Sequence, residues 1–184
     1  MIIIRSTVAC ATLFFSLSAF SAPKLEVIEH CSHDIIKLVK VNKLPVEAMQ
    51  MLHMVQVKDV TDGYNVVAIL DHNEDHTNPP AYIKFKYDLN AKMISFEYIA
   101  GFVNPNPSAF NKLPAAKLYD LAAEYLVDSS DQNLKQYAET VTMVHLSFDP
   151  VKNAALFEMV DSNQKEFKLW LDLSGKYIDS QFIN

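Results

Sequence analysis

The sequence contains one arginine, Arg5, and its 22 acidic residues outnumber 16 basic ones, which gives a formal charge of −6. Nucleic-acid binding requires a cationic surface that displaces counterions, and arginine supplies much of the phosphate and guanine recognition. An acidic chain is also poorly attracted to an anionic lipid surface. The composition therefore argues against nucleic acid and against an anionic membrane as partners.

Cysteine is equally scarce, with Cys10 and Cys31 only. Cys10 lies in an N-terminal segment that we expect to be removed, so the remaining chain has one thiol and forms no intramolecular disulfide. Its stability must come from packing. Apolar residues recur around this thiol at helical spacing, at Leu25, Ile28, Cys31, Ile35 and Leu38. This stripe predicts a buried, unreactive thiol; a reactive thiol or an intermolecular disulfide is the alternative.

Glycine is also scarce, and recognisable catalytic motifs are absent from the sequence. Three glycines, at 63, 101 and 175, fall at expected turns or strand ends, so no glycine-rich phosphate loop is present. The sequence has no Gly-x-Ser-x-Gly, Walker or His-Glu-x-x-His motif. Distant residues could still converge to form a site. Because none of these motifs is present, we predict that the protein is not an enzyme.

The first 21 residues have the composition of a secretory signal peptide. One positive charge, Arg5, precedes an apolar run from Val8 to Phe20, and the small residues at Ala19 and Ser21 place cleavage after Ser21. The run is shorter than the roughly 20 residues that a membrane span needs. Without Arg5 the formal charge becomes −7. We expect a soluble mature chain in the periplasm or outside the cell.

A phrase near the C-terminus repeats one that lies 84 positions earlier. "KLWLDLSGKYI", at 168–178, shares five of eleven residues with "KFKYDLNAKMI", at 84–94. Both alternate apolar and polar residues, break at a short turn after an aspartate, and alternate again. Each phrase therefore predicts a β-hairpin. The aspartates, Asp88 and Asp172, are expected to accept hydrogen bonds from the turn amides, a structural role.

The segments before each hairpin also correspond. Helical patterns precede strand patterns in both halves: helices at 25–41, 46–53, 113–127 and 132–139, and strands at 55–60, 65–71, 139–148 and 155–161. The fold class predicted is α+β, with two tandem helix-helix-four-strand units whose antiparallel sheets carry helices on one face. The units span 22–103 and 111–184, joined by a proline-containing linker at 104–110.

This unit resembles the cystatin-like and PepSY-like α+β modules of exported bacterial proteins. "FKLWLDLSGKYI" is similar to the closing hairpin of the PepSY-like modules. The tandem arrangement is similar to that of the secreted β-lactamase inhibitory proteins, although those use disulfides that this chain cannot make. The resemblance implies a binding or inhibitory module, and it carries over no catalytic residues.

A sheet with helices on one face leaves the other face available for solvent, dimerisation or a ligand. In the last hairpin Trp170 alternates onto the non-core face between Lys168 and Asp172. These three residues are the predicted ligand-binding group, with Trp170 as an aromatic anchor. Cover of Trp170 by the first unit is the alternative.

Two segments hold residues that can bind metals. The loop from Asp71 to His76, "DHNEDH", carries histidines and carboxylates, but it lacks the glycine and the final glutamate of a calcium-binding EF-hand loop. A solvated loop is the simpler interpretation, and a transition metal held by His72, His76 and a carboxylate is the alternative. "MQMLHM" places Met49, Met51, His53 and Met54 together, a soft set that suits cuprous copper. On the predicted helix they point in different directions and pack the core instead.

Taken together, these features predict a secreted or periplasmic non-enzymatic protein that binds another protein or an extracellular polymer through sheet faces and interdomain loops. It is expected to be a monomer or weak dimer without cofactor or metal. The alternative is an exported enzyme or metal-dependent factor that uses the 71–76 loop.

Overall fold

The computed structural model describes residues 21–71, 78–103 and 113–183. All but the last residue of the predicted signal peptide, the 71–76 loop after Asp71 and the whole predicted linker lie outside these ranges. Within them, the first half contains α1 (Lys24–Lys40), α2 (Val46–Gln50), β1 (Leu52–Val60), β2 (Gly63–Leu70), β3 (Tyr82–Asp88) and β4 (Met93–Ile99). The second half contains α3 (Ala115–Val127), α4 (Gln132–Thr140), β5 (Val141–Asp149), β6 (Ala154–Asp161), β7 (Glu166–Asp172) and β8 (Tyr177–Ile183).

All eight strands belong to one antiparallel sheet, in the order β4-β3-β2-β1-β5-β6-β7-β8. The predicted α+β class is therefore confirmed, but the expected pair of separate sheets is wrong. The two four-stranded halves join where β1 pairs with β5 at three positions, which we call the seam: Met54 with His145, Val55 with Val144, and Gln56 with Met143. Separate sheets would leave β1 and β5 as edges with unpaired amide groups, and pairing them satisfies those groups.

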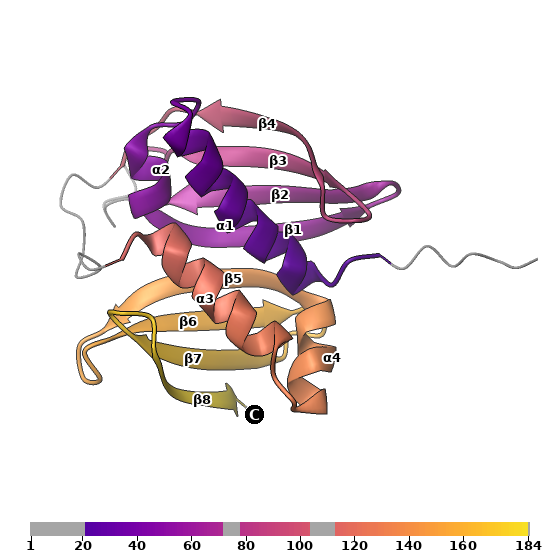
Figure 1. Cartoon of the computed structure of the whole chain (residues 1–184), viewed down its shortest axis with the longest axis vertical. Helices are drawn as coiled ribbons and strands as arrows, with labels where there is room; N and C mark the ends of the chain where they lie inside the picture. Colours follow the sequence, from indigo (N-terminus) through magenta and orange to yellow (C-terminus); the bar gives the residue numbers. More distant parts are fainter. Residues whose placement is uncertain (1–20, 72–77, 104–112, 184) are drawn as a thin grey trace, which may run out of the picture.

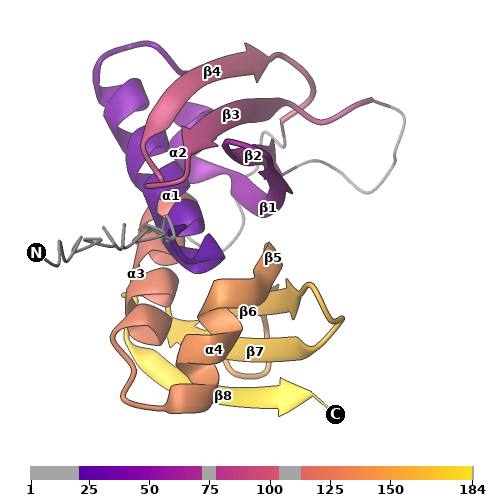
Figure 2. The same ribbon diagram turned by 90° about the vertical axis from the view of Figure 1, so that its right-hand side faces the viewer.

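The helices cover one face of this sheet. Figures 1 and 2 show α1 and α3 side by side on that face, each lying across its own half. We call the opposite face, which no described helix covers, the open face. Antiparallel sheets tolerate such one-sided cover because their side chains alternate between the core and the solvent.

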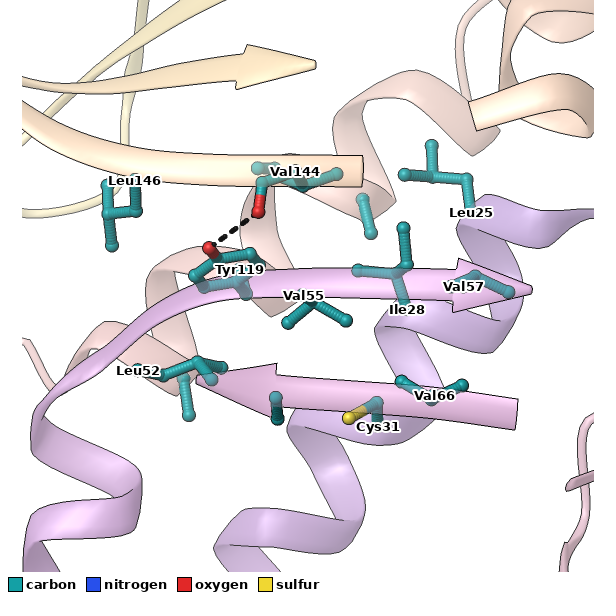
Figure 3. Packing of buried hydrophobic residues seen from close by; sticks show 14 of the residues in the cluster. Leu25, Ile28, Cys31, Leu52, Val55, Val57, Val66, Tyr119, Val144 and Leu146 are labelled. Atoms are coloured by element: carbon teal, nitrogen blue, oxygen red, sulfur yellow. Dashed lines mark hydrogen bonds between the residues drawn. The ribbon is translucent and has the colours of Figure 1, made fainter. Parts of the chain in front are cut away.

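A single hydrophobic core runs beneath both halves. Cys31 is fully buried in α1, as its helical phase predicts, and burial raises the pKa of its thiol. Figure 3 shows Cys31 in the same hydrophobic cluster as residues of β1 and β5: Val55, Val57, Val144 and Leu146. Burying one such side chain stabilises the fold by roughly 1.5–3 kcal/mol.

The second helix is shorter than the predicted range 46–53. The helix stops at Gln50, and β1 begins at Leu52, so His53 belongs to a strand. The register against β2 shifts between Leu52 and Met54, which marks a β-bulge. Because the bulge adds one residue, His53 and Met54 both turn away from the core while Leu52 and Val55 face it. The Met and His patterns therefore follow strand geometry, which the helical interpretation misses.

Aspartates close several strand ends in the same way. Oδ1 of Asp88 accepts the N–H groups two and four residues further on, each at 2.9 Å, and Oδ1 of Asp172 accepts the equivalent groups at 2.8 and 2.9 Å. Asp161 does the same at 2.8 Å for both. The predicted structural role of Asp88 and Asp172 is confirmed. The third residue after each has positive φ, 55° at Ala91 and 88° at Gly175.

Candidate functional site

The open face is built from cross-strand rows. Because the strands are in register, one row crosses all eight of them and collects aromatic, apolar, soft and charged side chains: Ile99, Tyr82, Ile69, Met54, His145, Glu158, Lys168 and Gln181. Directly opposed side chains lie about 5 Å apart at Cβ, so each row is a continuous surface. The seam lies at the centre of this face.

Two methionines meet at the seam. The Gln56 side-chain amide nitrogen lies 3.4 Å from the sulfur of Met54 and 3.8 Å from that of Met143, so both thioethers contact one amide. Both methionines directly follow the extra residue of a bulge, since β5 shifts register between Val141 and Met143 just as β1 does beside Met54. The bulges therefore direct both sulfur atoms onto the open face.

A histidine pair lies beside these sulfur atoms. Nε2 of His53 is 3.0 Å from Nε2 of His145, and the rings are nearly perpendicular. Nδ1 of His145 lies 3.4 Å from a carboxylate oxygen of Glu158. With the proton of His145 on Nδ1 and directed at Glu158, its Nε2 lone pair is the acceptor within the pair. Glu158 also binds the Lys168 ammonium at 2.7 Å, and this hydrogen bond is the main cause that lowers the pKa of Glu158.

Most of these side chains, but not His53, line a hollow of about 340 Å³ on the open face. Its lining includes Met54, Met143, His145, Glu158, Val160 and Lys168. A second hollow, of about 160 Å³, lies at the other side of His53 and is lined in part by Asp71. The seam therefore combines thioethers, imidazoles and charges in an accessible depression.

The three residues of the predicted ligand-binding group lie in different settings. Lys168 lines the larger hollow and pairs with Glu158. Trp170 is on the open-face side of β7 but is only 6% exposed. Its Nε1 donates to Asp149 at 2.7 Å, and the Lys152 ammonium lies 3.7 Å from its ring centre. The β5–β6 turn thus covers the tryptophan from within its own half.

Asp172, the third member, is engaged by its own turn. In addition to the two backbone amides, its Oδ1 accepts a hydrogen bond from the Ser174 hydroxyl at 2.6 Å. Lys168 alone of the three therefore presents its charge at the hollow.

The residues of the two segments that could bind metals also lie in different places. His72 to His76 lies outside the described residues. Met49 packs against the core from α2, and Met51, the residue between α2 and β1, is 6% exposed, whereas His53 and Met54 are on the open face. Their partners there, Met143 and His145, come from the other half of the chain, so a linear reading of "MQMLHM" misses them. The one signal in the sequence is the second Met-x-His spacing, "MVH" at 143–145.

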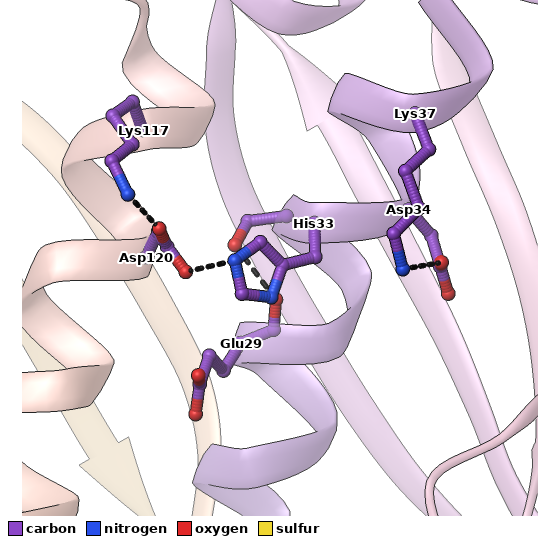
Figure 4. A network of polar contacts seen from close by, with 7 residues as sticks. Glu29, His33, Asp34, Lys37, Lys117 and Asp120 are labelled. Carbon is purple, nitrogen blue, oxygen red and sulfur yellow. Dashed lines mark hydrogen bonds and ion pairs between the residues drawn. The ribbon is translucent and has the colours of Figure 1, made fainter.

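Another polar cluster lies on the helical side, between α1 and α3. Asp120 is 4% exposed and accepts from Nε2 of His33 at 2.8 Å, while its other oxygen pairs with the Lys117 ammonium (Figure 4). Glu29 lies one helical turn from His33, and burial, followed by the charge of Asp120, raises the pKa of Glu29. Glu29, His33 and Asp120 could offer metal ligands within 4.8 Å of one another.

The helical cluster is better explained as a link between the helices. A buried carboxylate needs compensating charge and hydrogen bonds, and Lys117 with His33 supplies them at both oxygens of Asp120. Because an ammonium already neutralises Asp120, a metal ion would have to compete with it. The seam on the open face is therefore the stronger candidate site.

The chain has only low similarity to known proteins. No family model matches the chain, and no curated protein matches it. The chain is similar to a candidate lipoprotein of Clostridium difficile 630, with 13% identity, a TM-score of 0.33, and coverage of 89% of this chain and 95% of that one. It is also similar to a BLIP-like protein of Bacteroides fragilis NCTC 9343, with 15% identity, a TM-score of 0.24, and coverage of 88% and 87%. Similarities this low carry no argument about function.

In the described ranges, none of the helices has the length and apolar character that crossing a bilayer requires.

Proposed function

We propose that this protein is an exported, non-enzymatic binding protein that recognises another protein through the open face of its sheet. The observation that carries this proposal is the one-sided cover: the helices lie on one face, and the other face extends over eight strands. A surface of mixed apolar, soft and charged side chains suits recognition better than solvation alone. Its centre, at the seam, combines Met54, Met143 and His145 with the ion pair of Glu158 and Lys168.

The size of the open face fits a protein partner. Eight strands about 4.8 Å apart, with seven residues at about 3.3 Å each, give a face of roughly 34 by 23 Å, or ~780 Å². A standard protein interface covers about 800 Å² on each partner. A small ligand would need only a hollow of the kind that lies at the seam.

The repeat is also part of the proposal, with units at 22–103 and 111–184. It is supported by the common order of elements and by the matching bulges in β1 and β5. At the seam Val55 pairs with Val144, and each is the residue after the bulge methionine of its strand, so a local twofold axis passes through this pair. Two units related in this way form one wide face, as two subunits do in a symmetric dimer.

The proposal is tested by capturing the partner with matched charge variants. The mature chain is immobilised and exposed to the native extracellular medium, beside a face variant and a helix-side control. The face variant carries Val67→Glu and Lys168→Glu, because Val67 alternates with the buried residues of β2 onto the same face as Ile69. The control carries Val41→Glu and Lys40→Glu, at the exposed C-terminal end of α1. Both variants change one valine and one lysine. We expect one protein to be retained by the wild type and the control and to lose roughly tenfold or more in affinity for the face variant, since each buried charge costs over 1 kcal/mol.

Equal retention by the face variant and the wild type would contradict the proposal. Retained material that survives protease treatment of the medium would identify a polymer and contradict the assignment to a protein partner.

A further inference from the structure

Four soft side chains from both halves of the chain meet at the seam. His53 and Met54 come from β1, and Met143 and His145 come from β5, on the same face of the sheet. Imidazole nitrogen and thioether sulfur are the neutral ligands that cuprous ions prefer. Each half provides one histidine and one methionine, although the two segments are distant in sequence.

We propose that the seam binds one monovalent soft ion, Cu(I). Its primary ligands are Nε2 of His145 and Nε2 of His53, the latter in the tautomer that carries its proton on Nδ1, and the thioethers of Met54 and Met143 are the others. This inference goes beyond the proposed binding function and does not depend on it. The nitrogens are 3.0 Å apart. With metal–nitrogen bonds of about 2.05 Å, that separation gives an N–metal–N angle of roughly 95°, about 15° smaller than the tetrahedral angle of a four-coordinate d10 ion such as Cu(I).

In this proposal the sulfur atoms complete the site by rotation of the methionine side chains. Both thioethers contact the Gln56 amide, and Met54 directly faces His145 across the seam. Methionine is unbranched and rotates freely, so its sulfur can move from a weak amide contact to a metal. The hollow of about 340 Å³ beside them gives the ion a path from solvent.

The surroundings favour a singly charged ion. Glu158 is held by Lys168 at 2.7 Å and faces Nδ1 of His145, so it orients the imidazole rather than approaching the metal position. A carboxylate behind a histidine ligand fixes the tautomer and makes the ligand nitrogen more basic. The four ligands themselves carry no charge, which suits Cu(I) better than the zinc ion that thiolate and carboxylate ligands attract.

The site is tested with the complete mature protein under reducing, oxygen-free conditions. Cu(I) is titrated against a chromophoric cuprous chelator, with Ag(I) as a redox-inert substitute and Zn(II) as a comparison. We expect one Cu(I) per chain and loss of this binding in His53→Ala/His145→Ala. Met54→Leu/Met143→Leu and Glu158→Gln should each weaken it by roughly 10- to 100-fold, the range seen for supporting groups at metal sites.

A matched control variant carries His30→Gln and Met93→Leu, two residues that line a separate hollow on the helical side. It should bind Cu(I) as the wild type does. Circular dichroism of each variant checks the fold. Absence of one-to-one binding by the wild type, unchanged binding by the double histidine variant, or tighter binding of Zn(II) than of Cu(I) would each overturn the inference. In the first two cases the histidine pair is a hydrogen bond only.

Discussion

Replacing Tyr119 by phenylalanine removes one oxygen atom from the helical side of the seam. The Tyr119 ring is 1% exposed, and its hydroxyl donates to the carbonyl of His53 at 2.7 Å and lies 3.0 Å from that of Val144 (Figure 3). One side chain of α3 therefore bridges β1 and β5 where only three residue pairs join them.

These two hydrogen-bond contacts determine how much stability Tyr119→Phe should lose. Tyr119→Phe fills nearly the same volume, so the loss comes from polar groups and not from a cavity. Leaving buried carbonyl groups without their donor costs about 1–3 kcal/mol, and we expect the free energy of unfolding to fall by about 2 kcal/mol. For a domain of this size that loss corresponds to a fall in Tm of roughly 4–8 °C.

Urea unfolding measures the effect by two probes. Fluorescence follows the single tryptophan, Trp170, in the second half, and far-UV circular dichroism follows the whole chain. Tyr137→Phe is the matched control, because its hydroxyl is also buried and donates to Met159 and Lys165 within the second half. Both variants should lose stability, but only the Tyr119 variant should separate the two transitions, since it weakens the seam.

A change below about 0.5 kcal/mol for Tyr119→Phe, the usual effect of a surface substitution, would refute this reasoning. Separated transitions in the Tyr137 variant as well would show that the seam is not the coupling element.

The remaining predictions concern the turns and the thiol. Asp88→Ala and Asp172→Ala should each lower the free energy of unfolding by about 1 kcal/mol in urea titrations, without affecting partner binding. Hydrogen bonds from the Ser174 hydroxyl and from the backbone N–H of Lys176 lower the pKa of Asp172. Its contribution to the free energy of unfolding is therefore present above the unfolded-state pKa near 3.9 and is lost as the pH falls through the lower folded-state pKa. The stability of Asp172→Ala should decline less steeply with falling pH than that of the wild type. Gly175→Ala should cost about 1–2 kcal/mol, because its φ is 88° and a methyl group would meet Leu121. Cys31 should react with thiol reagents only at the rate of unfolding; rapid labelling of native protein would contradict its burial.

Local features of the fold could be predicted because local physics decides them. The helical stripe around Cys31 determines which side of α1 is buried. The alternation around Asp88 and Asp172 determines both closing hairpins and the hydrogen bonds of their turns. The two predicted strands that end at Asp71 and Asp161 suggest that these aspartates are equivalent. The register instead places Asp161 opposite Val141, in the position that Leu70 has in the first half. Strand ends alone do not fix register, since a bulge shifts it by one residue.

The candidate site depended on a pairing that no short sequence pattern encodes. Lys168 could be placed on the open face from its alternation with Leu169. Joining Met54 to His145 requires β1 and β5 to pair, and both strands carry patterns that would suit many neighbours. The cover of Trp170 by Lys152 likewise arises from a turn that folds over the face, which periodicity does not report.

Methionine oxidation in the complex tests the open face most directly. Met54 and Met143 are on that face, whereas Met93 lines a hollow on the helical side, so three natural probes sample both sides. The purified protein, free and with its captured partner, is exposed to brief peroxide treatment, and sulfoxide is quantified at each residue. We expect the partner to slow oxidation of Met54 and Met143 by roughly tenfold or more, as burial in an interface core requires, and to leave the oxidation rate of Met93 unchanged. Protection of Met93, with Met54 and Met143 oxidised as fast as in the free protein, would contradict this expectation.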